Sequence, residues 1–170
     1  IEALEFAAGE PGRKAVIFGV GFETTIPIFA SVLRRARERG IRNLFLLPAF
    51  KLLPPGLAAL LSRPGIGVDG LILPGNVTAV IGADAYRFIA ARHRLPGVVA
   101  GFETSDILRA VLMLLEMIAD GEPRILNEYT RFSDDRGNAA ALAAVREVFA
   151  PRDSVWRGLG TVPGSGLGLN

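Results

Sequence analysis

Short apolar runs alternate along the chain with amphipathic segments, four times over. The runs occupy residues 14–20, 43–48, 69–73 and 97–100, and the β-branched content of the first is typical of a strand covered on both faces, as in a parallel sheet. Helical spacing of apolar positions follows each run, at residues 26–39, 56–62, 84–92 and 105–120. The alternation predicts an α/β fold, a Rossmann-like parallel four-stranded sheet with helices on both faces.

The two ends of the chain depart from this alternation. Residues 1–8 have the spacing of a short helix, and a start inside a helix indicates a piece of a longer protein. Residues 138–150 predict another helix, whereas residues 151–170 hold the only tryptophan and many glycines, which predicts irregular packing loops. We therefore expect an α/β domain over residues 1–122 and a C-terminal extension over residues 123–170 that packs toward a neighbouring domain.

One motif occurs twice, each time between a strand and a helix. Gly-Phe-Glu-Thr-Thr occupies residues 21–25, and Gly-Phe-Glu-Thr-Ser occupies residues 101–105. The carboxyl ends of parallel strands form the edge where ligands bind, so we expect Glu23 and Glu103 to face one common cleft. Alternatively, both glutamates cap their helices. Thr24, Thr25 and Ser105 are better capping types, which would leave the glutamates free.

Other loops of the predicted sheet edge add polar groups. Lys51 follows the second strand and either neutralises an anion or is a surface lysine. Pro74-Gly75-Asn76 follows the third strand and is also compatible with a plain turn. The candidate catalytic residues are the two glutamates, since a pair of carboxylates can relay protons, bind a metal or hold a cation. The candidate binding residues are Gly21, Phe22, Thr24, Thr25, Lys51, Pro74, Gly75, Asn76, Gly101, Phe102 and Asp106.

The amino-acid composition argues against several classes of function. Half of the 170 residues are apolar, which suffices for a core, and the net charge is +2 with scattered basic residues, a poor footprint for nucleic acid. No run is long and clean enough to span a membrane and no signal peptide is visible, so we expect a cytoplasmic protein. The absence of cysteine excludes a disulfide scaffold, a thiol nucleophile and a Cys-based metal site within this chain, and a single histidine cannot supply the ligands of a zinc site. Gly19-x-Gly21 lacks the third glycine of a dinucleotide-binding loop.

Taken in order, the motifs resemble those of the HypD family of hydrogenase maturation factors. The matching segments are Gly-Phe-Glu-Thr-Thr, Lys-Leu-x-Pro-Pro, Pro-Gly-x-Val-x-x-x-Ile-Gly, Val-Val-Ala-Gly-Phe-Glu-x-x-Asp-Ile-Leu, Asn-x-Tyr-x-Arg, Trp-Arg-Gly-Leu-Gly and Pro-Gly-Ser-Gly-Leu. They extend over nearly the whole chain. Each motif alone is weak, but the ordered set is specific.

The resemblance implies a role in building the iron site of nickel–iron hydrogenases. It implies a scaffold formed with a HypC-like chaperone, on which an iron ion receives cyanide and carbonyl ligands, the cyanide coming from a HypE-like partner. It also implies α/β domains around a cleft, and iron and a 4Fe–4S cluster as cofactors of the full-length protein. No nucleic-acid or membrane partner is implied.

The chain departs from the family pattern in its ligands. Both sets of family cysteines are missing, and Phe50 and Asn76 stand where the resemblance leads us to expect histidines. Because 4Fe–4S clusters are held by thiolates, we expect this chain alone to hold neither iron nor a cluster. A fragment and a divergent homologue both fit. Two alternatives are a non-catalytic α/β docking module and a small-molecule enzyme with Glu23 or Glu103 as general base; the order of the motifs argues against the enzyme.

Overall fold

The chain folds into two compact units. A computed structural model describes residues 2–170. Unit 1 comprises the residues up to Leu53 together with Ala140–Asn170, and unit 2 comprises Pro54–Ala139. Unit 2 is thus inserted into unit 1. This division differs from the predicted one at residue 122, because the C-terminal segment belongs with the first two strands.

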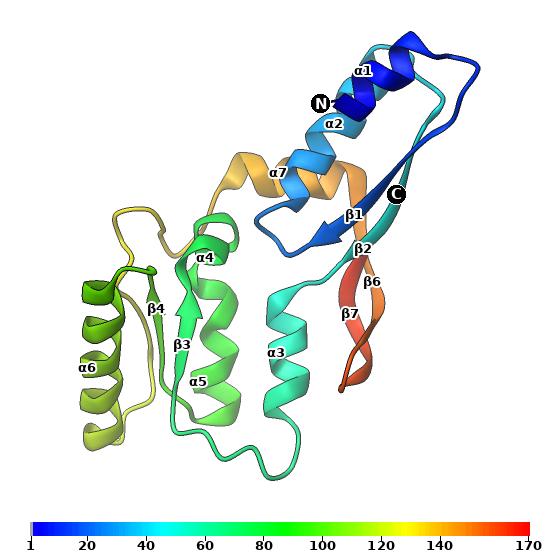
Figure 1. Cartoon of the computed structure of the whole chain (residues 1–170). Helices are drawn as coiled ribbons and strands as arrows, with labels where there is room; N and C mark the ends of the chain where they lie inside the picture. Colours follow the sequence, from blue (N-terminus) through cyan, green and yellow to red (C-terminus); the bar gives the residue numbers. More distant parts are fainter. Residues whose placement is uncertain (1) are drawn as a thin grey trace. The chain divides into compact units, whose positions relative to one another are not determined.

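Unit 1 is built on a parallel pair of strands. β1 (Ala15–Gly21) and β2 (Leu44–Phe50) pair in register, from Ala15 opposite Leu44 to Gly21 opposite Phe50 (Figure 1). The predicted strands at these positions are confirmed. The remaining elements of unit 1 are α1 (Glu2–Gly9), α2 (Ile26–Glu38), α7 (Ala139–Val148), β6 (Phe149–Trp156) and β7 (Gly160–Leu169).

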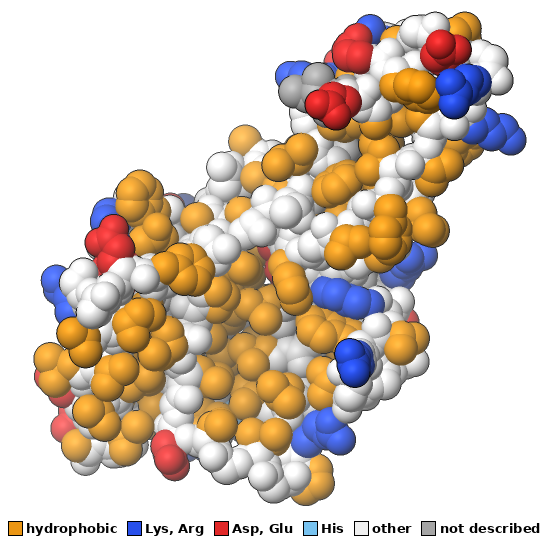
Figure 2. All heavy atoms as spheres, in the orientation of Figure 1, with side chains coloured by type: hydrophobic (Ala, Val, Ile, Leu, Met, Phe, Trp, Pro, Cys, Tyr) orange, Lys and Arg blue, Asp and Glu red, His pale blue; other side chains and the backbone are white. Residues whose placement is uncertain are grey.

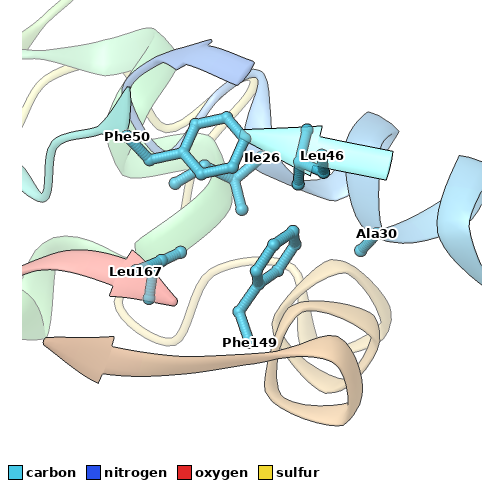
Figure 3. Packing of buried hydrophobic residues seen from close by; sticks show 6 residues of the cluster. All are labelled: Ile26, Ala30, Leu46, Phe50, Phe149 and Leu167. Carbon is cyan, nitrogen blue, oxygen red and sulfur yellow. The ribbon is translucent and has the colours of Figure 1, made fainter. Parts of the chain in front are cut away.

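Two phenylalanines lie at the centre of the core of unit 1. The ring of Phe50 is 5.6 Å from that of Phe149 and 5.0 Å from that of Phe29, both in edge-on geometries that aromatic pairs prefer. Figure 3 shows Phe50 and Phe149 approaching from different strands, with further aliphatic side chains between and around them. The buried members of this cluster are Ile26, Ala30, Leu46, Phe50, Phe149 and Leu167. Phe50 therefore serves the core, which accounts for an apolar side chain at this position.

The C-terminal segment is a hairpin, so the prediction of irregular loops for residues 151–170 is wrong. β6 and β7 pair antiparallel, from Phe149 opposite Leu169 to Trp156 opposite Gly160, with an irregularity between Arg152 and Ser154. The glycines of this segment made the strands hard to recognise, and one of them is required by its backbone conformation. Gly160 lies at the turn with a φ of 78°, a conformation that other residues rarely adopt. The hairpin buries Phe149, Val162 and Leu167.

Unit 2 contains a second parallel sheet. Its strands are β3 (Leu71–Pro74), β4 (Gly97–Ala100) and β5 (Ile125–Asn127), in the order β3-β4-β5. The helices are α3 (Leu53–Leu61), α4 (Gly75–Ile81), the 3₁₀ turn η1 (Ala83–Tyr86), α5 (Arg87–His93) and α6 (Thr104–Asp120). Figure 1 shows α5 and α6 on opposite sides of this sheet, and α6 packs against β4 through the core cluster Val98, Ala100, Ala110 and Met117.

The parallel α/β prediction is confirmed, but the single four-stranded sheet is not. The four predicted strands fall into two sheets, β1–β2 and β3–β4–β5, and the second sheet contains the short strand β5 that the sequence pattern missed. The expectation that the first strand is covered on both faces is also wrong: Val16, Phe18 and Val20 are exposed. No helix within residues 2–170 is long and apolar enough to cross a membrane.

The core of unit 1 gives a direct test of the packing. Phe50→Ala removes a fully buried ring, and we expect the free energy of unfolding to fall by about 3–5 kcal/mol. Urea titration followed by tryptophan fluorescence measures this, because Trp156 is the only tryptophan and lies in unit 1. The control is Phe18→Ala on the exposed face of β1, which we expect to change stability by less than about 0.5 kcal/mol. Equal losses in both variants would contradict the assigned core.

Candidate functional site

The loop after β1 is shaped by Gly21. This glycine has a φ of 146°, and a Cβ atom there would overlap the hydroxyl of Thr25. The Thr25 hydroxyl donates to the carbonyl of Phe22 at 3.0 Å, which closes the turn before α2. Thr25 occupies the N-cap position of α2, yet its side chain makes no capping hydrogen bond. Thr25 is therefore at the predicted cap position but does not cap the helix with its side chain. Its hydroxyl instead stabilises the loop that carries Glu23.

Glu23 is a buried carboxyl group with one unpartnered oxygen. Only 6% of the residue is exposed, and Oε1 accepts a hydrogen bond from the backbone N–H of Leu53 at 2.7 Å. Oε2 is buried and has no hydrogen-bond partner within residues 2–170. Burial raises the pKa of Glu23 above its ordinary value, and the hydrogen bond from Leu53 offsets only part of that shift. Glu23 is thus a group that holds a proton more readily than an exposed glutamate does.

Lys51 is tied to the C-terminal hairpin. Its Nζ donates to the carbonyl of Val155 at 2.7 Å and to the hydroxyl of Ser154. The same ammonium lies 6.0 Å from the ring centroid of Trp156, within range of a cation–π interaction. The Trp156 ring also contacts Phe22 of the first motif, with 6.1 Å between the centroids. The structure thereby gathers Phe22 and Lys51, both predicted, around Trp156, which sequence reasoning missed because the hairpin was read as loops.

The edge of the sheet in unit 2 is shaped by two more motif glycines. A Cβ atom at Gly75 would lie 2.6 Å from the carbonyl oxygen of Ala100 and would overlap the Tyr129 ring. A Cβ atom at Gly101 would lie 2.6 Å from the same ring and would overlap the carboxylate of Asp106. Neither glycine has a positive φ, so each is required by close approach alone. The ends of β3 and β4 thus meet the Tyr129 ring at one edge, as predicted for parallel strands.

Asp106 and Arg131 form the electrostatic centre of this edge. Arg131 Nη2 donates to Asp106 Oδ2 at 2.6 Å, and the Asp106 side chain is almost fully buried. This hydrogen bond is the main reason that the pKa of Asp106 lies below its ordinary value. The guanidinium is 4.8 Å from the Tyr129 ring centroid and 5.6 Å from that of Phe132. Asp106 is therefore engaged in holding Arg131 in place.

Glu103 differs sharply from Glu23. Its side chain is exposed, and its nearest charge is Arg131 Nη2 at 3.8 Å. Glu103, and not Ser105, occupies the N-cap position of α6, and it makes no side-chain capping bond. The alternative that Glu103 is a capping residue through its side chain is thus not supported. It is a carboxylate open to solvent or to a ligand.

Glu128 was not anticipated from the sequence. It follows β5, its side chain is almost fully buried, and Oε1 lies 3.5 Å from Nε of Arg109. Its Oε2 is buried and lacks a hydrogen-bond partner in the part of the chain that is described. The alternation Asn127-x-Tyr129-x-Arg131, which begins at the last residue of β5, marks this segment in the sequence, but the short strand was not recognised.

The remaining candidate residues are Thr24, Pro74, Asn76 and Phe102. Pro74 precedes α4, which begins at Gly75, so a helix starts where the sequence also allowed a plain turn. Asn76 and Phe102 are exposed, and Thr24 is half-buried. Glu23 and Glu103 follow strands of different sheets, so the expectation that they share one sheet edge is wrong. A common cleft stays a prediction.

Comparison with known proteins gives a consistent result. A family model named HypD, described as "Hydrogenase formation hypA family", matches residues 1–170. Proteins named hydrogenase maturation factor HypD are 42% identical in Escherichia coli K12, 44% in Rhodobacter capsulatus and 40% in Rhizobium leguminosarum bv. viciae, over 98–99% of this chain. The chain spans about half the length of these relatives, 45–46%.

The burial of Glu23 predicts an unusual pH dependence. Because its pKa is raised in the folded state, the stability that this group contributes is complete at low pH and is lost as pH rises through the folded pKa. We expect Glu23→Gln, which keeps the acceptor for Leu53, to be more stable than the parent at pH 7 but not at pH 4. Urea unfolding followed by Trp156 fluorescence measures both. Glu103→Gln is the control and should change little at either pH. A Glu23→Gln variant that is less stable at pH 7 would mean that Oε2 has a partner.

The lowered pKa of Asp106 predicts a pH dependence of stability opposite to that of Glu23. Its pKa is lowered from an ordinary 3.8, so its contribution is present above that value and is lost as pH falls through the folded pKa. We expect Asp106→Asn to destabilise unit 2 at pH 7, with the difference from the parent shrinking below pH 3.8. Hydrogen exchange of the α6 amides at several pH values measures this locally. A difference that is independent of pH would show that packing, and not charge, explains the effect.

Proposed function

Because the chain belongs to the HypD family, we propose that it acts in hydrogenase maturation, as part of the scaffold on which the iron site of nickel–iron hydrogenases is assembled. The observation that carries the proposal is the match over the entire chain, with both Gly-Phe-Glu motifs at the carboxyl ends of parallel strands. The activity belongs to a protein of the relatives' full length, about half of which this chain spans.

We propose different roles for the two motif glutamates. Glu23 is buried, holds a proton more readily than usual and has one oxygen without a partner, so it is suited to exchange a proton with a substrate in a site that excludes water. Glu103 is exposed and is suited to hold a cation or a basic group of a partner. Asp106 positions Arg131 and is not free to act as a base.

The 4Fe–4S cluster implied by the resemblance does not fit the residues of this chain. Such clusters are held by cysteine thiolates, and the chain has no cysteine. Within residues 2–170, no three His, Asp or Glu side chains are grouped so that they could hold a metal ion. Iron, as the cargo of the reaction, would take its sulfur ligands from segments outside these residues or from a partner.

We propose that the partners of this chain are a HypC-like and a HypE-like protein. The two motif phenylalanines, Phe22 and Phe102, are exposed, and exposed aromatic side chains are frequent anchors at protein interfaces. The same observation favours the second candidate function, a docking module that binds these partners without chemistry. The two candidates differ in whether the proton of Glu23 is needed.

A chimera tests the proposal. In E. coli HypD, the region that matches this chain is replaced by residues 1–170, and hydrogenase activity is measured in a strain lacking its own HypD. We expect activity, and an at least tenfold loss on Glu23→Gln, because an amide cannot exchange the proton. Glu38→Gln, at the exposed end of α2, is the matched control and should retain activity.

Three other outcomes would revise the assignment. A fully active Glu23→Gln chimera would remove Glu23 from the chemistry. An inactive chimera that still binds purified E. coli HypC would favour the docking module, and introducing Asn76→His would show whether the missing imidazole is responsible. A chimera without activity or binding would overturn both candidate functions.

A further inference from the structure

A cavity of unit 1 lies at the opposite end of the strand pair from Glu23. Its volume is about 610 Å³, which is typical of sites for small molecules. Its wall includes residues that precede β1 and β2, whereas Glu23 follows the carboxyl end of β1. We refer to it as the basic cavity, after the basic residues that line it: Arg13, Lys14, Arg39 and Arg42. Among the described residues, no aspartate or glutamate lines it.

The positive charge is concentrated in the basic cavity itself. Figure 2 shows basic and acidic side chains intermingled at the end of unit 1 that carries α1, at the upper right of the view. Of the four basic residues that line the cavity, only Arg39 forms an ion pair within residues 2–170, with Glu5 at 2.6 Å. The other three have no carboxylate partner in the described part of the chain. A concave site lined by one sign of charge attracts the opposite sign, so the cavity favours an anion.

Aromatic rings hold two of these cations in place. The guanidinium of Arg13 lies 5.1 Å from the centroid of the Phe6 ring, and the ammonium of Lys14 lies 5.9 Å from that of Phe45. Both distances are within the range of a cation–π interaction. The two side chains are thus positioned by contacts that leave their N–H donors available to a ligand.

The loop that carries Arg13 is fixed to the start of β2. Nδ2 of Asn43, a residue that lines the basic cavity, donates to the carbonyls of Ala7, Glu10 and Arg13 at 2.7–3.0 Å. One amide group thereby joins the end of α1 and the turn after it to the strand pair. The wall of the cavity is formed before a ligand arrives, which lowers the entropic cost of binding.

The helix dipole does not account for the cations of the basic cavity. Basic side chains favour the last turn of a helix, and α2 has Arg35 and Arg37 there. Neither of these two lines the cavity. Arg13, Lys14 and Arg42 lie outside the helices of unit 1, beyond the last turn, in which the dipole acts. Their convergence on one cavity therefore needs a different reason.

We propose that the basic cavity binds a small organic phosphate. Guanidinium groups match phosphate oxygens with paired N–H donors, and lysine adds a further charge. A phosphate monoester carries about −1.5 to −2 charges at pH 7, which the three unpaired cations can neutralise. The rest of the wall is largely apolar and includes Ile41 and Phe45, so it suits the carbon part of such a molecule. The site uses residues of unit 1 alone and is independent of the proposed function in hydrogenase maturation.

Isothermal titration calorimetry of the 170-residue chain tests the site, with phenyl phosphate as the probe. We expect saturable binding, and we expect Arg13→Gln and Arg42→Gln each to raise the Kd about tenfold, because each removes charge-assisted hydrogen bonds to the phosphate. The control Arg35→Gln removes the same charge from α2 outside the cavity, and it should change the Kd less than about twofold. All three positions are exposed, so circular dichroism should stay unchanged.

The apolar wall is tested with inorganic phosphate as a second probe. We expect Phe45→Ala to weaken the binding of phenyl phosphate about fivefold more than that of inorganic phosphate, because only the former places a ring against this wall. Inorganic phosphate that binds as tightly as phenyl phosphate would overturn the organic part of the assignment. An absence of saturable binding would overturn the site. Equal losses in Arg13→Gln, Arg42→Gln and Arg35→Gln would also overturn it, because they would indicate a diffuse attraction to the whole surface.

Discussion

The packing of Phe149 on Phe50 is the contact on which unit 1 depends. It joins a strand near the start of the chain to a hairpin at its end, across all of unit 2. Two parallel strands alone bury too little apolar surface to be stable, so the hairpin and α7 supply the missing cover. The same hairpin carries Trp156 and the groups that bind Lys51. The core and the first candidate site therefore depend on the same closure.

At the sheet edge of unit 2, an aromatic ring and a buried carboxylate pack closely against the ends of β3 and β4. Asp106 comes from α6, whereas Tyr129 and Arg131 come from the segment after β5, and the two segments meet only because Gly75 and Gly101 leave no side chain in the way. The buried carboxylate of Asp106 is stabilised because Arg131 donates to it directly. The glycines of the motifs thus have a steric reason that is independent of any ligand, and the exposed Phe102 and Glu103 are the residues of the second motif that no packing requirement explains.

The sequence predicted β1, β2, β3 and β4 because continuous apolar runs identify strands regardless of their partners. It did not predict which strands share a sheet, since that depends on contacts between distant segments, and it missed β5, which is only three residues long. The hairpin was missed because its glycines and prolines imitate loops. At the candidate site, Glu23 was found from its place after a strand, whereas its burial, the partners of Lys51 and the role of Arg131 follow from residues 25 or more positions away.

The insertion of unit 2 into unit 1 sets an order for folding during synthesis. Unit 2 is complete once Ala139 has left the ribosome, and its contacts are all available at that point. β1 and β2 precede unit 2 in the chain, and Phe50 is covered only once residues 140–170 have also been synthesised. During that interval the apolar side chains of the strand pair are open to association with other chains. A premature stop between the two units would leave a folded unit 2 attached to a permanently open strand pair.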